Sequence, residues 1–162
     1  MIRRLKIYLD TSVLGGIFDI EDSQRMKIVQ QCLKKIKRGD FEVFISRLTI
    51  QELMDAPLEI KEKLIKIVED IQPKILEETE ESLEIAEAYI NEGIIPEKFR
   101  DDARHIAIVS FYEIDFLVSW NYHHMVNIKV KKLVNAINLR LGYKLIEIVP
   151  PEEVVEYGEM EL

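Results

Sequence analysis

Four side chains with oxygen donors stand beside the ends of predicted secondary-structure elements, in well-separated parts of the chain. Asp10 directly follows an apolar run, and Glu52 lies in the helix that follows a second such run. Asp102 begins another helix, and Asn121 follows a third apolar run after Trp120. Open α/β sheets bind ligands beyond the carboxyl ends of their strands, where the strand order switches. We therefore predict that these four side chains meet at one edge of a sheet.

Such a set of oxygens is suited to hard divalent cations. Mg²⁺ and Mn²⁺ bind through a few carboxylates together with the phosphate oxygens of a substrate. Two ions about 4 Å apart can activate a water on one side of a phosphate and stabilise the leaving oxygen on the other. Clustered carboxylates repel one another, and a bound cation relieves that repulsion. Thr11 and Ser12 directly follow Asp10, where they can hydrogen-bond a metal-bound water or a substrate phosphate.

Alternating strands and helices must position these side chains. Short apolar runs predict strands at residues 5–9, 41–46, 74–76, 115–119 and 144–149. Apolar residues at helical spacing predict helices at 23–38, 59–71, 80–91, from 101 onward, and 129–141. A loop is expected after the first strand, and Thr49 is the expected N-cap of a short helix. This alternation predicts a mainly parallel sheet covered by helices on both faces.

Several segments together resemble one family of nuclease domains. They are YLDTSVL, TIQEL, DDARHIAIVS and DFLVSWNYHHMVN, and they occur in this order along the chain. The ordered set resembles the PIN domain, above all the VapC-like toxins and their relatives. The resemblance runs from Lys6 to about Val154, with Asp-Thr-Ser after a strand as its least specific piece and D-A-x-H-I-A before F-L-V-S-W-N as its most specific.

The resemblance implies a three-layer α/β/α fold and Mg²⁺- or Mn²⁺-dependent cleavage of RNA. Asp10, Glu52 and Asp102 match the three acidic positions of the family, and Asn121 stands at a fourth position that is often Asp. An amide oxygen can bind a cation but brings no charge, so one metal and two metals both stay open. Many relatives are toxins neutralised by a small antitoxin, and many form homodimers, so both kinds of partner are expected here.

Each of these residues also has a simpler structural interpretation. Glu52 and Asp102 can merely favour a helix N-terminus, as we expect for Asp101. For His105 we expect a partly buried, hydrogen-bonded role, and for Trp120 we expect packing. His124 lies close to the proposed site and is a candidate for contacting a phosphate or assisting proton transfer. The basic cluster at residues 34–38 is expected to be a solvated helix end, and the lysines at 129, 131 and 132 are better placed to reach RNA.

Composition narrows the class of protein. The chain has 162 residues, of which 48% are hydrophobic and 32% are charged, which suits one globular domain. We expect a nuclease-like domain over residues 1–154 and an acidic tail over 155–162. Cys32 is the only cysteine, which excludes an internal disulfide and a zinc site built from cysteines. No apolar run is long enough for a membrane span and no secretory signal is present, so we expect a cytoplasmic protein.

Other functions fit the sequence less well. A haloacid dehalogenase-type phosphatase needs a second Asp two residues after the first, where this chain has Ser12. A dinucleotide-binding domain needs a G-x-G-x-x-G turn, and Gly15-Gly16 arrives late and without that spacing. The stronger alternative is a PIN-like binding or scaffold module with weak or no catalysis. It is supported by Asn121 and by the net charge of −8, which opposes broad binding of nucleic acid.

Overall fold

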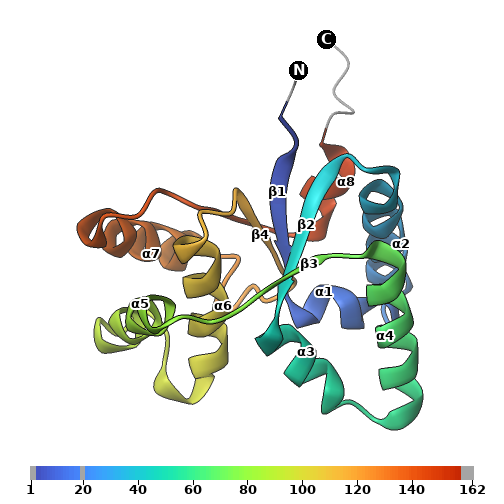
Figure 1. The fold of residues 1–162 in the computed structure, drawn as a ribbon, viewed down its shortest axis with the longest axis horizontal. Coiled ribbons are helices and arrows are strands. Elements are labelled where there is room, and N and C mark those ends of the chain that lie inside the picture. The colour runs from blue at the N-terminus through green and yellow to red at the C-terminus, as the bar shows by residue number, and fades with distance from the viewer. Residues whose placement is uncertain (1–2, 19–20, 158–162) are drawn as a thin grey trace.

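Five parallel strands form one sheet at the centre of the protein, with helices on both sides (Figure 1). The computed structural model describes residues 3–18 and 21–157. The strands are β1 (Leu5–Leu9), β2 (Phe41–Ser46), β3 (Lys74–Leu76), β4 (Phe116–Val118) and β5 (Glu147–Val149). The helices are α1 (Thr11–Gly15), α2 (Ser23–Arg38), α3 (Arg47–Met54), α4 (Leu58–Ile71), α5 (Glu80–Asn91), α6 (Arg100–Phe111), α7 (Ile128–Leu141) and α8 (Pro151–Glu156), with short 3-10 turns η1 (Gly16–Phe18) and η2 (Glu97–Phe99). No helix within the described ranges has the length and apolarity needed to cross a membrane.

The strand order is β3-β2-β1-β4-β5. The chain places β1, β2 and β3 outward in one direction and then returns to place β4 on the other side of β1. The register sets Tyr8 of β1 opposite Phe44 of β2 and Leu117 of β4. The switch in strand order therefore lies between the carboxyl ends of β1 and β4, which is where sheets of this kind bind ligands.

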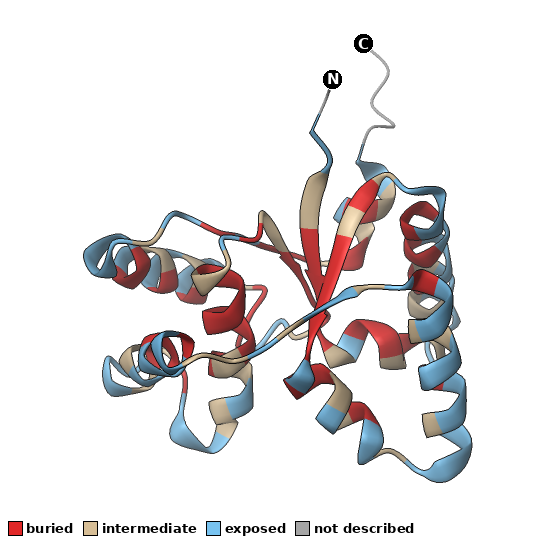
Figure 2. Cartoon of the chain, in the orientation of Figure 1, coloured by how far each residue is buried: buried red, intermediate tan, exposed pale blue. Residues whose placement is uncertain are grey.

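Successive residues of β1, β2, β4 and β5 point to opposite faces of the sheet, and their apolar side chains enter two separate cores. Tyr8 and Phe44 pack into the core beneath α5, α6 and α7. Ile7, Leu9 and Ile45 pack into the core beneath α1, α2, α4 and α8. Figure 2 shows β1, β2 and β4 largely buried between these two layers of helices, whereas the edge strand β3 is mostly exposed. The predicted three-layer α/β/α architecture with a parallel sheet is confirmed.

Two local predictions are wrong at the starts of helices. The chain forms helix α1 directly after β1, where a loop was predicted, and Asp10 is its N-cap. The N-cap of α3 is Ser46, and Thr49 occupies the third helical position. Ser46 Oγ accepts from Thr49 N at 3.3 Å and Thr49 Oγ1 accepts from Ser46 N at 3.4 Å, so the pair closes a reciprocal capping box. Both helices therefore begin at the carboxyl edge of the sheet.

The C-terminal part of the described chain packs on α2. Helix α8 lies against α2, and Lys35 is buried in this region, where its Nζ donates to the carbonyl of Tyr157. The prediction of a fully solvated basic helix end is therefore wrong for Lys35. The expected boundary between the domain and the tail, at residues 154 and 155, falls inside α8. The last part of that tail, residues 158–162, lies outside the described residues.

Candidate functional site

Asp10 stands at the switch in strand order, directly after β1 and beside β4. Its backbone N donates to the carbonyl of Val118 at 3.3 Å. Its Oδ1 accepts from Ser12 Oγ at 2.6 Å and from Val13 N at 3.3 Å, and its Oδ2 accepts from Ser119 Oγ at 2.6 Å. These three donors hold the carboxylate in one orientation, and all of them are neutral groups.

The hydrogen-bond partners of Asp10 supply no positive charge to balance its carboxylate. The side chain is buried, and burial raises its pKa because a charged carboxylate loses its hydration. The electrostatic effect of His105 and the hydrogen bonds from Ser119 and Ser12 only partly oppose this rise. No Lys or Arg of the described ranges forms a hydrogen bond or ion pair with Asp10. A cation bound here would supply the missing charge.

Glu52, on α3, reaches the same edge of the sheet. Its Oε1 accepts from Thr11 Oγ1 at 3.1 Å and from His105 Nε2 on α6. Burial raises the pKa of Glu52. The hydrogen bonds from His105 and Thr11 lower this pKa by more than burial raises it, so it lies below its ordinary value. Glu52 is therefore ionised at neutral pH. Within the described residues no hydrogen bond is made to its Oε2, which leaves this oxygen for a ligand.

Asp102, in the first turn of α6, faces the loop that follows β4. Its Oδ2 accepts from Asn121 Nδ2 at 3.1 Å and lies 3.1 Å from His124 Nδ1. Asn121 Oδ1 accepts from the backbone N of His124 at 3.0 Å, so the Asn121 side chain stabilises the turn that follows it. The His124 ring is buried against Phe99, with 4.0 Å between ring centroids. These contacts fix the loop against the start of α6.

Ser119 joins the two halves of the site. Its hydroxyl donates to Asp10 Oδ2 and accepts from the backbone N of Asn121 at 2.9 Å. Thr11 connects Glu52 to the helix that Asp10 caps. All seven site residues predicted from the sequence thus lie along one edge of the sheet, in a network of Glu52, Thr11, Ser12, Asp10, Ser119, Asn121, Asp102 and His124.

Thr11 and Ser12 hold the carboxylates. The Thr11 hydroxyl donates to Glu52, and the Ser12 hydroxyl donates to Asp10 while accepting from Trp120 N at 3.0 Å. The sequence led us to expect these hydroxyls to contact a water or a phosphate. In the structure they orient carboxylates, and Ser12 also ties α1 to the end of β4.

The carboxylate and amide groups at this edge are of the kind that bind a divalent cation, but they are not already grouped around one position. In the described part of the chain, no three or more His, Cys, Asp or Glu side chains are grouped as a metal site. The oxygen donors nevertheless suit Mg²⁺ or Mn²⁺, and Asp102 Oδ1, like Glu52 Oε2, takes no hydrogen bond within the described ranges. Bringing the carboxylates onto one ion requires side-chain rotations, and these compete with the bonds that Glu52 makes to His105 and Asp102 makes to Asn121.

Sequence reasoning missed two parts of this network. Ser119 was not singled out, although a small polar residue at the end of a buried strand is a signal for it. His105 was expected to be hydrogen-bonded and partly buried, and it is buried and hydrogen-bonded. Its partner Glu52, however, was not foreseen. The spacing of Asp102 and His105, three residues apart on one helix, places them on the same face and could have indicated it.

Trp120 packs, as predicted. It is buried beside the site, and the guanidinium of Arg25 lies 4.6 Å from its ring centroid. Its Nε1 has no hydrogen-bond partner among the residues that the structure describes, and an added Cβ on Gly16 would lie 3.0 Å from it. The indole therefore seals the packing between η1, α2 and the loop after β4.

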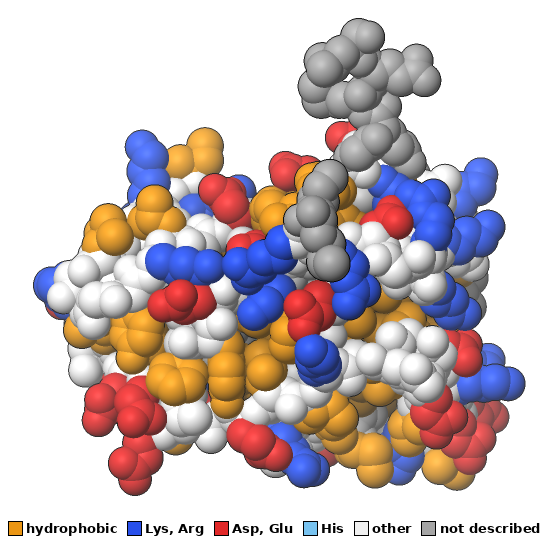
Figure 3. Space-filling model, turned by 45° about the horizontal axis from the view of Figure 1, so that its top comes forward, with side chains coloured by type: hydrophobic (Ala, Val, Ile, Leu, Met, Phe, Trp, Pro, Cys, Tyr) orange, Lys and Arg blue, Asp and Glu red, His pale blue; other side chains and the backbone are white. Residues whose placement is uncertain are grey.

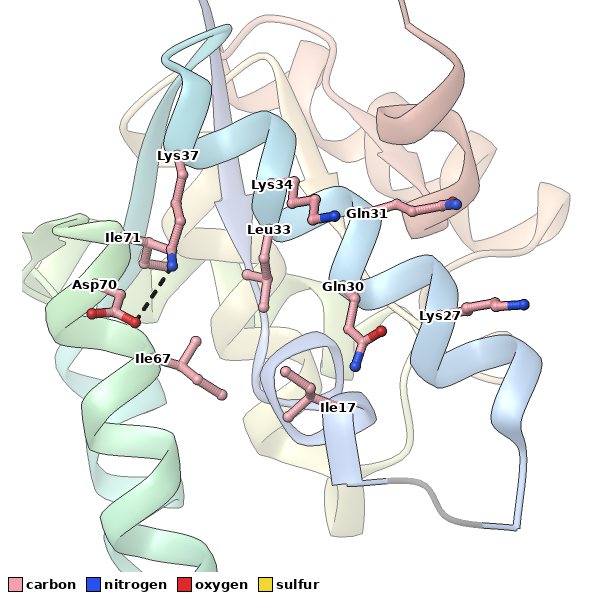
Figure 4. A pocket seen from close by; sticks show the side chains of 10 residues that line it. All are labelled: Ile17, Lys27, Gln30, Gln31, Leu33, Lys34, Lys37, Ile67, Asp70 and Ile71. Carbon is pink, nitrogen blue, oxygen red and sulfur yellow. Dashed lines mark hydrogen bonds and ion pairs between the residues drawn. The ribbon is translucent and has the colours of Figure 1, made fainter.

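Other surface features of the molecule lie away from this network. Figure 4 shows a pocket of about 420 Å³ between α2 and α4, with Lys37 Nζ 3.4 Å from Asp70 Oδ2 at its side. In the view of Figure 3, which brings forward the end of the molecule at which β1 begins, Lys and Arg side chains lie among Asp, Glu and hydrophobic side chains. Asp10 lies at the opposite end of β1. The lining of the pocket includes none of the network residues and consists of Ile17, Lys27, Gln30, Gln31, Leu33, Lys34, Lys37, Ile67, Asp70 and Ile71.

Comparisons with known proteins assign no family. No protein-family model matches the chain, and a search of curated proteins finds no match. The likeness to PIN domains therefore stands on the quoted motifs, and what it implies for activity is a proposal.

Proposed function

We propose that the protein is a divalent-metal-dependent ribonuclease that hydrolyses RNA phosphodiester bonds. The observation that carries the proposal is the gathering of Asp10, Glu52 and Asp102 along one edge, at the switch in strand order. A binding site at this position is the general expectation for open α/β sheets. The PIN-like motifs supply the reaction class.

Each residue has a defined task in this proposal. Asp10, Glu52 and Asp102 would hold the ion, with Asn121 as a neutral fourth donor. When bound, Mg²⁺ or Mn²⁺ lowers the pKa of water and neutralises charge on phosphoryl oxygens. Glu52 Oε2 and Asp102 Oδ1 can each accept a proton from an attacking water. Thr11 keeps Glu52 in place, and Ser12 does the same for Asp10.

His124 is proposed to act at the substrate side of the site. Its Nδ1 faces Asp102, and its ring contacts the tilted ring of Phe99 and, edge-on, the ring of His123. Because Nδ1 donates to the Asp102 carboxylate, Nε2 is the ring nitrogen left to contact the substrate, and it can donate to a phosphate only when the imidazole is protonated. The setting proposed for the reaction is the cytoplasm. A small antitoxin and a second copy of the chain are partners proposed from the motif resemblance, with the protein as the toxin of a toxin-antitoxin pair.

A cleavage assay tests the proposal. Mixed RNAs are incubated with the protein in Mn²⁺ or in EDTA, beside the variants Asp10→Asn and Asp102→Asn. Asp101→Asn is the matched control, because Asp101 neighbours Asp102 but is exposed and, among the described residues, its side chain bonds only to Arg104. We expect cleavage by the wild type and by the control in Mn²⁺ alone. Cleavage that persists in EDTA or in Asp10→Asn would come from a contaminant and would remove the support for this function.

The second candidate function is a PIN-like binding module without catalysis. Two observations favour it: no pre-grouped metal site is found in the described residues, and Asn121 replaces a charged donor. On this alternative the network only rigidifies the edge of the sheet. The same assay separates the two functions, because a binding module retains RNA in a gel-shift experiment but leaves it intact in Mn²⁺.

A further inference from the structure

We propose that Tyr8 and His105 are positioning residues that hold Glu52 with its Oε2 turned toward the site. The inference rests on the proposed function, in which Glu52 is a ligand of the ion. It adds a buried support between β1 and α6. This support begins in the strands β1 and β2 and ends at the carboxylate.

His105 bridges the core and the site. It lies on α6, is only 2% exposed, and has Tyr8 on one side and Glu52 on the other. The Tyr8 hydroxyl lies 2.7 Å from His105 Nδ1, and Nε2 contacts Glu52 Oε1. The Tyr8 and His105 rings pack edge to face with 5.7 Å between centroids. Both ring nitrogens are thus engaged, which fixes the plane of the imidazole.

The protons in this chain of bonds run in one direction. An ionised Glu52 can only accept, so His105 Nε2 carries the proton that it donates. Burial raises the pKa of Tyr8, so its phenol keeps a proton, which it donates to Nδ1. Ser46 Oγ, 2.7 Å from the Tyr8 oxygen, donates to it in turn. One proton then serves each hydrogen bond of this chain.

The position of Ser46 is itself fixed by the backbone. The capping box of α3 anchors Ser46 Oγ and Thr49 Oγ1 on main-chain N–H groups, and Thr49 Oγ1 also lies 3.2 Å from the Tyr8 hydroxyl. The orientation of the Tyr8 hydroxyl therefore follows from how α3 starts. Through His105, the same helix start determines the orientation of Glu52, which the helix also carries.

The result of this support is a carboxylate with two distinct oxygens. His105 and Thr11 both hold Oε1 of Glu52, so Oε2 is the oxygen left for an ion or a water. Groups that hydrogen-bond to metal ligands orient them, and losing such a group typically weakens metal affinity by roughly 10- to 100-fold. Removing the Tyr8 hydroxyl releases one side of His105, and through it the carboxylate.

A matched control lies in the same core. Tyr89 is fully buried, and its hydroxyl is 3.0 Å from Ser110 Oγ and 2.5 Å from Asn138 Oδ1. The Tyr89 hydroxyl is hydrogen-bonded, as the Tyr8 hydroxyl is, but its partners lie on α6 and α7 and are not part of the network. Tyr8→Phe and Tyr89→Phe therefore remove the same atom from equally buried rings, and only the first change touches the support of Glu52.

The experiment compares the wild type with these two variants by heteronuclear NMR of the His105 imidazole and by titration with Mn²⁺ alone. Thermal melting checks that all three proteins are folded. We expect His105 in the Nε2–H form with a slowly exchanging proton in the wild type and in Tyr89→Phe. In Tyr8→Phe we expect faster exchange of that proton and an Mn²⁺ affinity lower by roughly 10-fold.

Three results would overturn the inference. They are an Nδ1–H form in the wild type, an imidazole signal unchanged by Tyr8→Phe, and an equal loss of Mn²⁺ affinity in both variants. A wild type that binds no Mn²⁺ contradicts the proposed function instead. In that case the imidazole signals still decide whether Tyr8 sets the orientation of His105 toward Glu52.

Discussion

Replacing Asp10 with Asn should stabilise the metal-free protein while it abolishes activity. The wild-type carboxylate is buried among neutral donors. An Asn side chain has nearly the same shape, and its Oδ1 can keep the bonds from Ser12 and Val13. Its amide N would donate to Ser119 Oγ, whose hydroxyl can turn toward Ser12 Oγ, 3.4 Å away. The hydrogen bonds are thus preserved, and the cost of burying a charge is removed.

The size of the expected gain in stability can be estimated from other stabilising substitutions. Single stabilising substitutions commonly yield about 0.5–2 kcal/mol, and we expect a gain of this size here. For a chain of this size each kcal/mol moves the melting temperature by roughly 2–4 °C, so Asp10→Asn should melt about 1–8 °C higher in EDTA. In Mn²⁺ the order should reverse. An ion at about 100 times its Kd stabilises the wild type by about 2.7 kcal/mol, and the variant lacks a central ligand.

The pH dependence of this difference has a definite sign. The pKa of Asp10 is raised in the folded protein, so the folded state binds this proton more tightly than the unfolded state. The wild type therefore loses stability as the pH rises from the ordinary pKa of 3.8 through the raised one. Asp10→Asn has no such loss. Its advantage should be largest at neutral pH and should vanish in acid, below the ordinary pKa.

Differential scanning calorimetry of the two proteins in EDTA and in Mn²⁺, across this pH range, measures these differences. The reasoning is refuted if Asp10→Asn melts lower than the wild type in EDTA at neutral pH. It is also refuted if Mn²⁺ shifts the melting temperature of both proteins equally.

Two further substitutions test the packing and the helix start beside the site. Gly16→Ala places a Cβ 2.9 Å from Val29 Cγ2 and 3.0 Å from Trp120 Nε1. It should lower the free energy of unfolding in urea by about 1–3 kcal/mol. Gly15→Ala, whose Cβ meets nothing within 4 Å, is its control, and equal effects of the two would contradict this packing. Ser46→Ala removes the N-cap of α3 and should lower the unfolding free energy by about 1–2 kcal/mol, whereas an unchanged value would mean that the capping box contributes nothing.

The features that could be predicted from the sequence are those encoded locally. Apolar runs ending in polar residues identified the strands, and Asp10 was placed at a strand end because Asp follows such a run. The two-sided burial of the sheet followed from the alternation of strands with helices. The strand β5 is shorter than the predicted 144–149, because Leu145 is exposed and the backbone of Ile146 hydrogen-bonds to the side chain of Asn135.

The features that could not be predicted depend on contacts between distant segments. The sequence of a single strand does not determine which strands it pairs with, so the switch in strand order between β1 and β4 could be identified only in the folded sheet. The same holds for Ser119 on Asp10 and for His105 on Glu52, which join residues far apart in the chain. Lysine side chains are usually solvated, but Lys35 is buried because α8 packs on its helix.

The most direct test of the account is a crystal structure determined in Mn²⁺, with anomalous scattering to locate the ion. The central claim is that carboxylates from separate segments can share one divalent cation at this edge of the sheet. We expect an anomalous peak about 2.2 Å from an oxygen of Asp10, with Glu52 or Asp102 rotated toward it. No peak at this edge, with Asp10 still bonded only to Ser12, Val13 and Ser119, would contradict the claim.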